Sequence, residues 1–262
     1  MTDRKYLFPN VIELNLAAGK PLGVNIYLID GGTEFALLDI GLNETLEDVI
    51  DVIRKMDFPL SKCKWIVATH ADADHIQAMT SARERLRAKT AAHPQAATLI
   101  ESAELIQTYA SITAQNILIP LTPCKIDKRL ADGDSLKIGS LKLDVLHTPG
   151  HTPGQLSFRL GNLLFSGDNI YKDGCVGVID AHHGSHLPSF IKSLTMLRDT
   201  DAEFLLPSHG PAFRHDRKLI QSAIDRLTKY QEMADFGTCA IRWPLQEAWE
   251  QDILAGKMPS WD

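Results

Sequence analysis

The chain has 262 residues, of which 44% are hydrophobic and 23% charged, and its formal net charge is −6 at pH 7. This composition is ordinary for a globular protein that buries its core in one large or two small domains. The negative charge gives no electrostatic reason to expect a polyanionic partner, so a nucleic-acid-binding function is disfavoured.

The first third of the chain alternates strand-like and helix-like segments. Short apolar runs bounded by glycines or turn residues predict strands over 11–16, 25–29 and 34–38. Apolar residues at helical spacing predict a helix over 43–56 with Asn43 as its N-cap. A buried strand over 65–69 and a helix over 76–89 are expected next.

The second half begins with two predicted hairpins, in the first of which apolar and polar residues alternate. The first pairs 135–138 with 141–146, and the second pairs 155–160 with 163–166. A helix over 188–198, a strand over 204–206 and a helix over 214–234 follow. Two sheets packed face to face with helices outside would satisfy this pattern. The order of the strands within each sheet is left open.

The remaining bulk features concern location and partners. The start of the chain has no apolar segment typical of a secretory signal, and no run approaches the roughly 20 apolar residues that cross a bilayer. The four cysteines are scattered, without a Cys-x-x-Cys pair, as is typical of reduced thiols. We therefore expect a cytoplasmic protein with a small-molecule substrate and neither nucleic acid nor membrane as a partner. A homodimer is left open.

The segment His70-Ala71-Asp72-Ala73-Asp74-His75 places two imidazoles and two carboxylates within six residues. Because it lies between a predicted strand and a predicted helix, its four polar side chains could converge on one point. Neutral imidazoles and carboxylates are the ligands that Zn, Fe and Mn accept. The segment predicts a metal site, although an ordinary surface loop can also hold such residues.

Three further polar side chains occupy comparable places. His151 lies in a turn rich in Pro and Gly between two predicted strands, Asp168 ends an apolar run, and His209 follows another. Each one alone is better explained as a turn histidine or a capping aspartate. Rigid scaffolds present their chemistry on loops at strand ends, so four such placements in one chain indicate a common functional site.

These motifs, taken in order, resemble those of the metallo-β-lactamase-fold superfamily over about residues 11–233. The early Asp-x-Gly is Asp39-Ile40-Gly41, the Gly-His-Thr-x-Gly motif spans 150–154, and the late histidine precedes Gly210-Pro211. The resemblance implies an α+β fold, a four-layer αβ/βα sandwich of two mixed β-sheets with helices on the outer faces. This domain would cover 1–235, with 236–262 as a C-terminal extension packed on it. The segments 167–171 and 25–29 look like those of the glyoxalase II and lactonase-like branches.

The resemblance also implies two divalent metal ions, Zn or Fe with Mn as an alternative, at the shared edge of the sheets. Carried over by position, the ligands would be His70, Asp72, Asp74, His75, His151, Asp168 and His209. Asp168 would bridge the two ions, Asp74 would also act in catalysis, and Asp39 would orient the metal-binding loop without touching metal. A loop with His182, His183 and His186 could line the substrate pocket, or it could be an ordinary solvated loop.

Asp72 departs from the family pattern, which has a second histidine at this position. Two divalent ions, three aspartates and a bridging hydroxide sum to zero charge, whereas a histidine would leave one positive charge. The oxygen ligand favours harder ions such as Fe or Mn, and the lower charge weakens polarisation of a substrate carbonyl. Asp72 could bind a metal, point away and leave one site weak, or mark an inactive member of the family.

The resemblance implies an enzyme, a metal-dependent hydrolase of a small ester, thioester or lactone that uses a metal-bound hydroxide. Asp72 supports an alternative, an iron-dependent oxidoreductase acting on oxygen, nitric oxide or a persulfide. A third reading is a non-catalytic ligand sensor. Glutathione recognition is not expected, because Val178 stands where glyoxalase-type relatives often carry an arginine.

Overall fold

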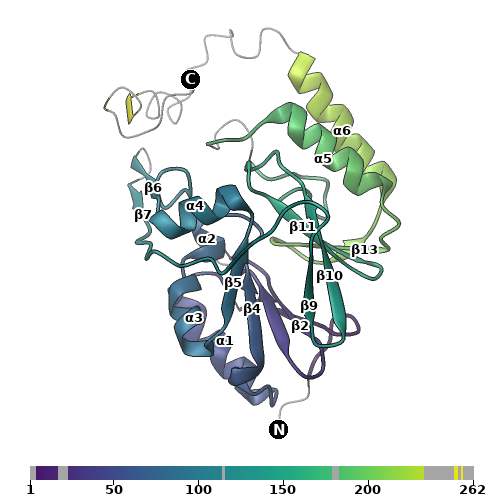
Figure 1. Cartoon of the computed structure of the whole chain (residues 1–262). Coiled ribbons are helices and arrows are strands. Elements are labelled where there is room, and N and C mark those ends of the chain that lie inside the picture. Colours follow the sequence, from purple (N-terminus) through teal and green to yellow (C-terminus); the bar gives the residue numbers. More distant parts are fainter. Residues whose placement is uncertain are drawn as a thin grey trace.

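Two six-stranded sheets pack against each other at the centre of the molecule, and helices cover their outer faces (Figure 1). The computed structural model describes residues 4–16, 23–113, 116–178, 183–232, 251–252 and 255. The sheets are mixed, because each contains both antiparallel and parallel neighbours. The four-layer αβ/βα sandwich predicted from the sequence is therefore confirmed.

The first sheet has the strand order β1-β2-β3-β4-β5-β8. Its strands are β1 (Val11–Leu14), β2 (Ile26–Asp30), β3 (Phe35–Leu38), β4 (Cys63–Val67), β5 (Lys89–Ala92) and β8 (Lys128–Arg129). The four neighbouring strands β3, β4, β5 and β8 are parallel to one another, and helices connect them. These helices are α1 (Asn43–Lys55), α2 (Ala73–Ile76), α3 (Met79–Leu86) and α4 (Pro94–Ser102), with a 3-10 turn at Leu60–Lys62.

The second sheet has the order β14-β13-β12-β11-β10-β9. Its strands are β9 (Ser135–Ile138), β10 (Leu141–His147), β11 (Leu156–Leu160), β12 (Leu163–Gly167), β13 (Phe204–Pro207) and β14 (Phe213–Arg214). The helices α5 (Leu187–Asp199) and α6 (Arg217–Glu232) pack on its outer face. A small hairpin of β6 (Ser111–Ile112) and β7 (Ile117–Leu118) stands apart from both sheets.

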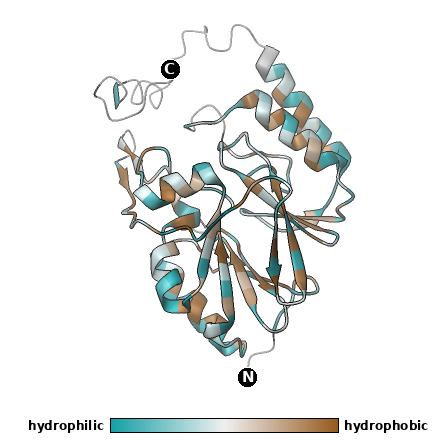
Figure 2. Ribbon diagram, viewed as in Figure 1, coloured by the Kyte–Doolittle hydropathy of each residue, from teal (hydrophilic) through white to brown (hydrophobic). Residues whose placement is uncertain are grey.

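The alternation of side chains along each strand divides the core into layers. In β2, Leu28 faces the cluster under α1 and α3, whereas Ile29 faces the cluster between the sheets. Phe158 and Phe165 meet Ile29 from the second sheet. Because the central strands are buried on both faces, their sequences read as continuous apolar runs. Figure 2 shows this pattern, with hydrophobic strands inside and hydrophilic residues on the helices.

Three predicted element boundaries are wrong. The helix predicted over 76–89 is shorter, because α2 ends at Ile76, α3 begins at Met79, and Arg87 adopts a left-handed φ of 51° that ends α3 before β5. Asn43 is not the N-cap, because Leu42 takes that position and the Asn43 N–H donates to Gln77 Oε1 at 2.8 Å. The helix predicted from 214 begins at Arg217, because the residues before it pair with β13.

Two other predictions concern the limits of the fold. The C-terminal extension predicted over 236–262 lies outside the described residues except for 251–252 and 255, so the proposed domain boundary stays a prediction. Among the helices that the structure describes, none has the length and apolar character needed to cross a membrane.

The backbones of the two sheets are in close contact where the β2–β3 turn meets the β9–β10 turn. A Cβ on Gly31 would lie 2.1 Å from the Ile138 carbonyl oxygen, and the Ser140 N–H donates to the Gly31 oxygen at 3.2 Å. We expect Gly31→Ala to lower the free energy of unfolding by about 1–3 kcal/mol, because the added methyl group would force the two backbones apart. Urea denaturation measures this change, and an unaltered midpoint would contradict the close approach.

Candidate metal centre

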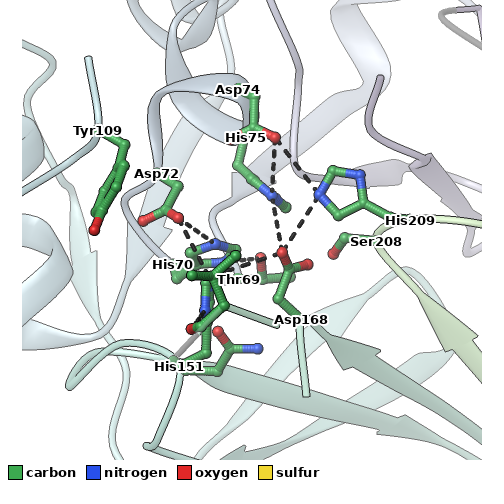
Figure 3. A network of polar contacts seen from close by, with 12 residues as sticks. Thr69, His70, Asp72, Asp74, His75, Tyr109, His151, Asp168, Ser208 and His209 are labelled. Atoms are coloured by element: carbon green, nitrogen blue, oxygen red, sulfur yellow. Dashed lines mark hydrogen bonds and ion pairs between the residues drawn. The ribbon is translucent and has the colours of Figure 1, made fainter. Parts of the chain in front are cut away.

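All seven side chains predicted to bind metal meet at one edge of the two sheets (Figure 3). The loop after β4 and the short α2 bring His70, Asp72, Asp74 and His75 from the first sheet. The second sheet supplies the others from the turn between β10 and β11 and from the loops after β12 and β13, namely His151, Asp168 and His209. All except Asp74 and His209 are buried.

The ligand atoms fall into two groups, one on each side of Asp168. His70, Asp72 and His151 offer atoms that all lie within 4.8 Å of one another, and so do Asp74, His75 and His209. In the first group, Asp72 Oδ2 lies 3.2 Å from His151 Nε2 and 3.5 Å from His70 Nε2. In the second, Asp74 Oδ2 lies 3.5 Å from His209 Nε2 and 3.6 Å from His75 Nε2.

Asp168 lies between the two groups. Its Oδ2 is 3.3 Å from His209 Nε2 and 3.8 Å from the Nε2 atoms of both His75 and His151. Ligands of a tetrahedral ion with bonds of about 2.1 Å are about 3.4 Å apart, so these spacings are those of atoms that surround an ion. The geometry suits a carboxylate shared by two ions.

Each of the four imidazoles is oriented by a hydrogen bond at Nδ1, so that Nε2 faces the cluster. This arrangement is common for histidines that bind a metal, because the second bond fixes the tautomer and the ring direction. The Nδ1 atoms of His70, His75, His151 and His209 lie 2.8–2.9 Å from Thr69 Oγ1, Asp39 Oδ2, the Val178 oxygen and the Gly23 oxygen, respectively.

Two atoms that face the centre of the cluster are buried without a hydrogen-bond partner among the described residues. They are Nε2 of His70 and Nε2 of His75. Leaving such atoms unpaired is costly, and a cation held between them and the Asp168 carboxylate would satisfy both. The donor set of imidazoles and carboxylates therefore fits one or two divalent ions.

Electrostatics within the cluster agree with this fit. Burial alone would raise the pKa of Asp168, but the neighbouring His75 and His209 hold it well below its usual range. Burial lowers the pKa of His209, but Asp168 raises it to about 9. The pKa of His70 is lowered by burial and by His75. The carboxylate is thus kept ionised by positive charge, which metal ions would supply in place of protons.

Asp39 holds the candidate metal-binding loop, residues 69–75, by hydrogen bonds at both of its ends. Its Oδ1 accepts from the Thr69 N–H at 2.8 Å, and its Oδ2 lies 2.9 Å from Thr69 Oγ1, 2.9 Å from His75 Nδ1 and 3.3 Å from Ser208 Oγ. Asp39 has a φ of 58°, a left-handed conformation that costs energy for a non-glycine residue. These contacts suit the orienting role predicted for it.

We expect Asp39→Asn to weaken metal binding by about 10- to 100-fold, because an amide cannot accept all of these hydrogen bonds or favour the same tautomer of His75. Competition with a chromogenic chelator measures the affinity. Asp30→Asn is a matched control, since Asp30 is a buried carboxylate in β2 that accepts from Tyr6 and the Gly32 N–H. Equal affinity in the wild type and both variants would contradict the role of Asp39.

His209, which follows β13 of the second sheet, is positioned by residues just before β2 of the first sheet. Asn25, just before β2, donates from Nδ2 to the Gly210 oxygen at 2.6 Å and to the Pro207 oxygen at 3.0 Å, and its N–H donates to the Ser208 oxygen at 2.7 Å. The loop that carries His209 is thus held from both sides by residues of the first half of the chain.

The histidines predicted to line a pocket have different surroundings. His182 lies outside the described residues. His183 is buried, and its N–H donates to Tyr109 Oη at 3.2 Å. His186 is exposed, and its Nδ1 lies 2.8 Å from Ser189 Oγ at the start of α5. The pocket role of these three residues stays a prediction.

Two tyrosines near the cluster were missed by the sequence reasoning. The ring of Tyr171 lies 5.9 Å from that of His209, and burial and the adjacent Asp168 raise its pKa well above the usual range. Its position three residues after Asp168 could have drawn attention to it. Tyr109 lies near Asp72, and no motif surrounds it (Figure 3).

A comparison with protein families matches residues 19–209 to the model of the metallo-beta-lactamase superfamily. The acyl-coenzyme A thioesterase MBLAC2 of Gallus gallus is 25% identical over 239 residues, which cover 83% of each chain. Glyoxylase B2 of Dictyostelium discoideum is 31% identical over 170 residues, 61% of this chain and 54% of the glyoxylase, so the match spans about half of that relative. The solved structure of TTHA1623 in a di-iron-bound form matches with a TM-score of 0.65 and 28% identity, covering 81% of this chain and 98% of that one.

Proposed function

Because the chain belongs to the metallo-β-lactamase superfamily, we propose that it is a metal-dependent hydrolase of a small ester, thioester or lactone. The observation that carries the proposal is the convergence of two other carboxylates and four imidazole Nε2 atoms around Asp168. The names of the thioesterase and glyoxylase relatives support the choice of substrate class. The substrate would be a small molecule that reaches the partly exposed side of the cluster at Asp74 and His209.

Each residue of the cluster has a definite task in this proposal. His70, Asp72 and His151 would hold one divalent ion, Asp74, His75 and His209 the other, and Asp168 both. Bound ions would supply Lewis acidity toward a water molecule and toward the substrate carbonyl. Asp74 is the ligand suited to catalysis, because its partly exposed carboxylate can orient the attacking water and take up its proton.

A second candidate is an iron-dependent oxidoreductase. Asp72 supports it, because a third carboxylate favours a harder ion than a histidine at this position would. The di-iron-bound form of TTHA1623, at 28% identity, is a second point in its favour. In this candidate the same seven side chains would hold two irons, and the reaction would involve oxygen, nitric oxide or a persulfide.

Elemental analysis and a substrate panel, applied to protein purified without added metal, test the proposal. We expect about two divalent ions per chain and hydrolysis of at least one ester, thioester or lactone, lost on chelation and restored by the metal. Iron with an oxygen-dependent change in its spectrum, and no hydrolysis, would support the oxidoreductase instead. Metal-loaded protein that binds a panel compound but turns over none would indicate a ligand sensor.

A further inference from the structure

Tyr109 is fixed to the metal-binding loop, although no motif surrounds it in the sequence. It follows Thr108, whose buried carbonyl oxygen accepts from the Ala73 N–H at 2.7 Å. Ala73 lies between two of the metal-binding candidates, Asp72 and Asp74. The backbone beside Tyr109 therefore has a set position relative to the centre, and Figure 3 shows its phenol ring near Asp72.

The backbone of Tyr109 is held in an unfavourable conformation. Its φ is 56°, in the left-handed region, which costs an aromatic residue of the order of 1–2 kcal/mol. The Tyr109 N–H donates to the Ile106 oxygen at 3.1 Å, and the Ala110 oxygen accepts from the Ile119 N–H at 2.6 Å. Strained residues held by their surroundings concentrate at functional sites, so this side chain is a candidate for a task at the centre.

Residues from the second half of the chain contact Tyr109 and, next to it, the candidate ligand His151. The His183 N–H donates to Tyr109 Oη at 3.2 Å, and the two rings lie 5.4 Å apart. Ser185 Oγ donates to the His151 oxygen at 2.7 Å and lies 3.3 Å from the Val178 oxygen, which also accepts from His151 Nδ1. Tyr109, His183 and Val178, which we call the Tyr109 rim, therefore border the side of the centre that contains Asp72 and His151.

The Tyr109 rim contains an exposed apolar residue, Val178, whose carbonyl oxygen lies 2.8 Å from Nδ1 of the metal-binding candidate His151. The Val178 side chain is 56% exposed, one of few large apolar residues with this much exposure in the described part of the chain. Tyr109 adds an aromatic ring, which lies 5.4 Å from the ring of His183. A neutral aromatic ring and an exposed aliphatic side chain gain free energy when an apolar group covers them.

We propose that Tyr109 is a specificity-determining residue and that the Tyr109 rim binds the apolar part of an acyl group, so that the substrate is an ester or thioester of an aliphatic acid. This inference rests on the hydrolase function proposed above. Binding the chain against Tyr109 and Val178, on the side of Asp72 and His151, would leave its carbonyl end directed toward Asp74, the residue proposed to orient the attacking water.

The test compares hydrolysis of acetyl and octanoyl esters and thioesters, with p-nitrophenol and thiophenol as leaving groups, by metal-loaded enzyme. We expect the wild type to prefer octanoyl substrates. Tyr109→Ala should reduce the ratio of kcat/KM for octanoyl over acetyl substrates by about tenfold, mainly by raising KM for the octanoyl compounds, because the ring surface is lost. Tyr109→Phe keeps the ring and should retain the ratio within about twofold.

Matched variants separate a specificity role from a structural one. Tyr6→Ala removes a tyrosine that is 42% exposed and bonded to Asp30, and it should leave the ratio unchanged. Val178→Ala removes an exposed side chain without opening the core and should lower the ratio about threefold, even if Tyr109→Ala does not fold. Metal content and the thermal midpoint of each variant show whether the centre and the fold persist.

The outcomes for the two proposals differ. Absence of turnover by the loaded wild type on the whole ester, thioester and lactone panel overturns the hydrolase function. Turnover without an octanoyl preference, or a ratio that stays at the wild-type value in both Tyr109→Ala and Val178→Ala, overturns only the role of the Tyr109 rim.

Discussion

An Asp168→Asn variant is expected to lose hydrolysis by about a thousandfold or more and to retain less metal than the wild type. Asp168 Oδ2 lies 3.3–3.8 Å from the Nε2 atoms of three histidines, so its charge serves both groups of ligands. The amide has nearly the same shape but no charge, and a thousandfold loss corresponds to about 4 kcal/mol of transition-state stabilisation. Elemental analysis and kcat/KM on the best panel substrate measure the two effects.

Asp144→Asn is the control for this experiment. Asp144 lies on β10 and is paired with Lys142 at 2.6 Å; its side chain is about half exposed, and it is not one of the candidate ligands. The control should keep wild-type metal content and activity, and circular dichroism should show that both variants are folded. Full activity and full metal content in Asp168→Asn would contradict the assignment of Asp168 as a shared ligand.

Asp72→His is expected to change which metal the protein selects. The substitution replaces an oxygen ligand with nitrogen and raises the net charge of a loaded centre by one, and both changes favour zinc over iron or manganese. After exposure of metal-free protein to equal concentrations of zinc, ferrous iron and manganese without oxygen, the ratio of zinc to iron should rise by about tenfold in the variant. Elemental analysis after desalting gives this ratio.

Asp72→Glu is the matched variant, because it keeps a carboxylate and should keep the wild-type preference. The proposed role of Asp72 requires the two variants to differ. If both retain the wild-type ratio of metals, then Asp72 does not contact an ion, and the ions depend on the other six side chains alone.

Much of the fold was predictable because its information is local. The central strands, including β11 and β12, are short apolar runs ended by turns, and the β9–β10 hairpin alternates between more and less buried residues. The end of α3 was not predictable, because Arg87 is an ordinary helix former that takes a left-handed φ where the chain turns into β5. Two-residue strands such as β6 and β7 carry too few side chains to show any period.

The same distinction applies to the centre. The seven candidate ligands were predicted because each is a polar side chain at the end of an apolar strand, and such ends meet at one edge of a folded sheet. Two of the groups that orient the histidines are the backbone carbonyls of Gly23 and Val178, and a backbone carbonyl cannot be identified from the type of its residue. Tyr109 is brought to the centre by tertiary contacts. The Ala73 N–H donates to the carbonyl oxygen of the preceding residue, Thr108, and the His183 N–H donates to the Tyr109 hydroxyl.

The hydrogen bonds of Asn25 join the two sheets at the edge where the metal would bind, and a bound metal would strengthen this junction. They fasten the start of the first sheet to the loop of His209, while Asp168 reaches from the second sheet toward the imidazole of His75. An ion coordinated by residues of both sheets would link them, so the free energy of metal binding would oppose separation of the two sheets. Chelation would then loosen the junction between the two halves before it disturbed the apolar layers within either one.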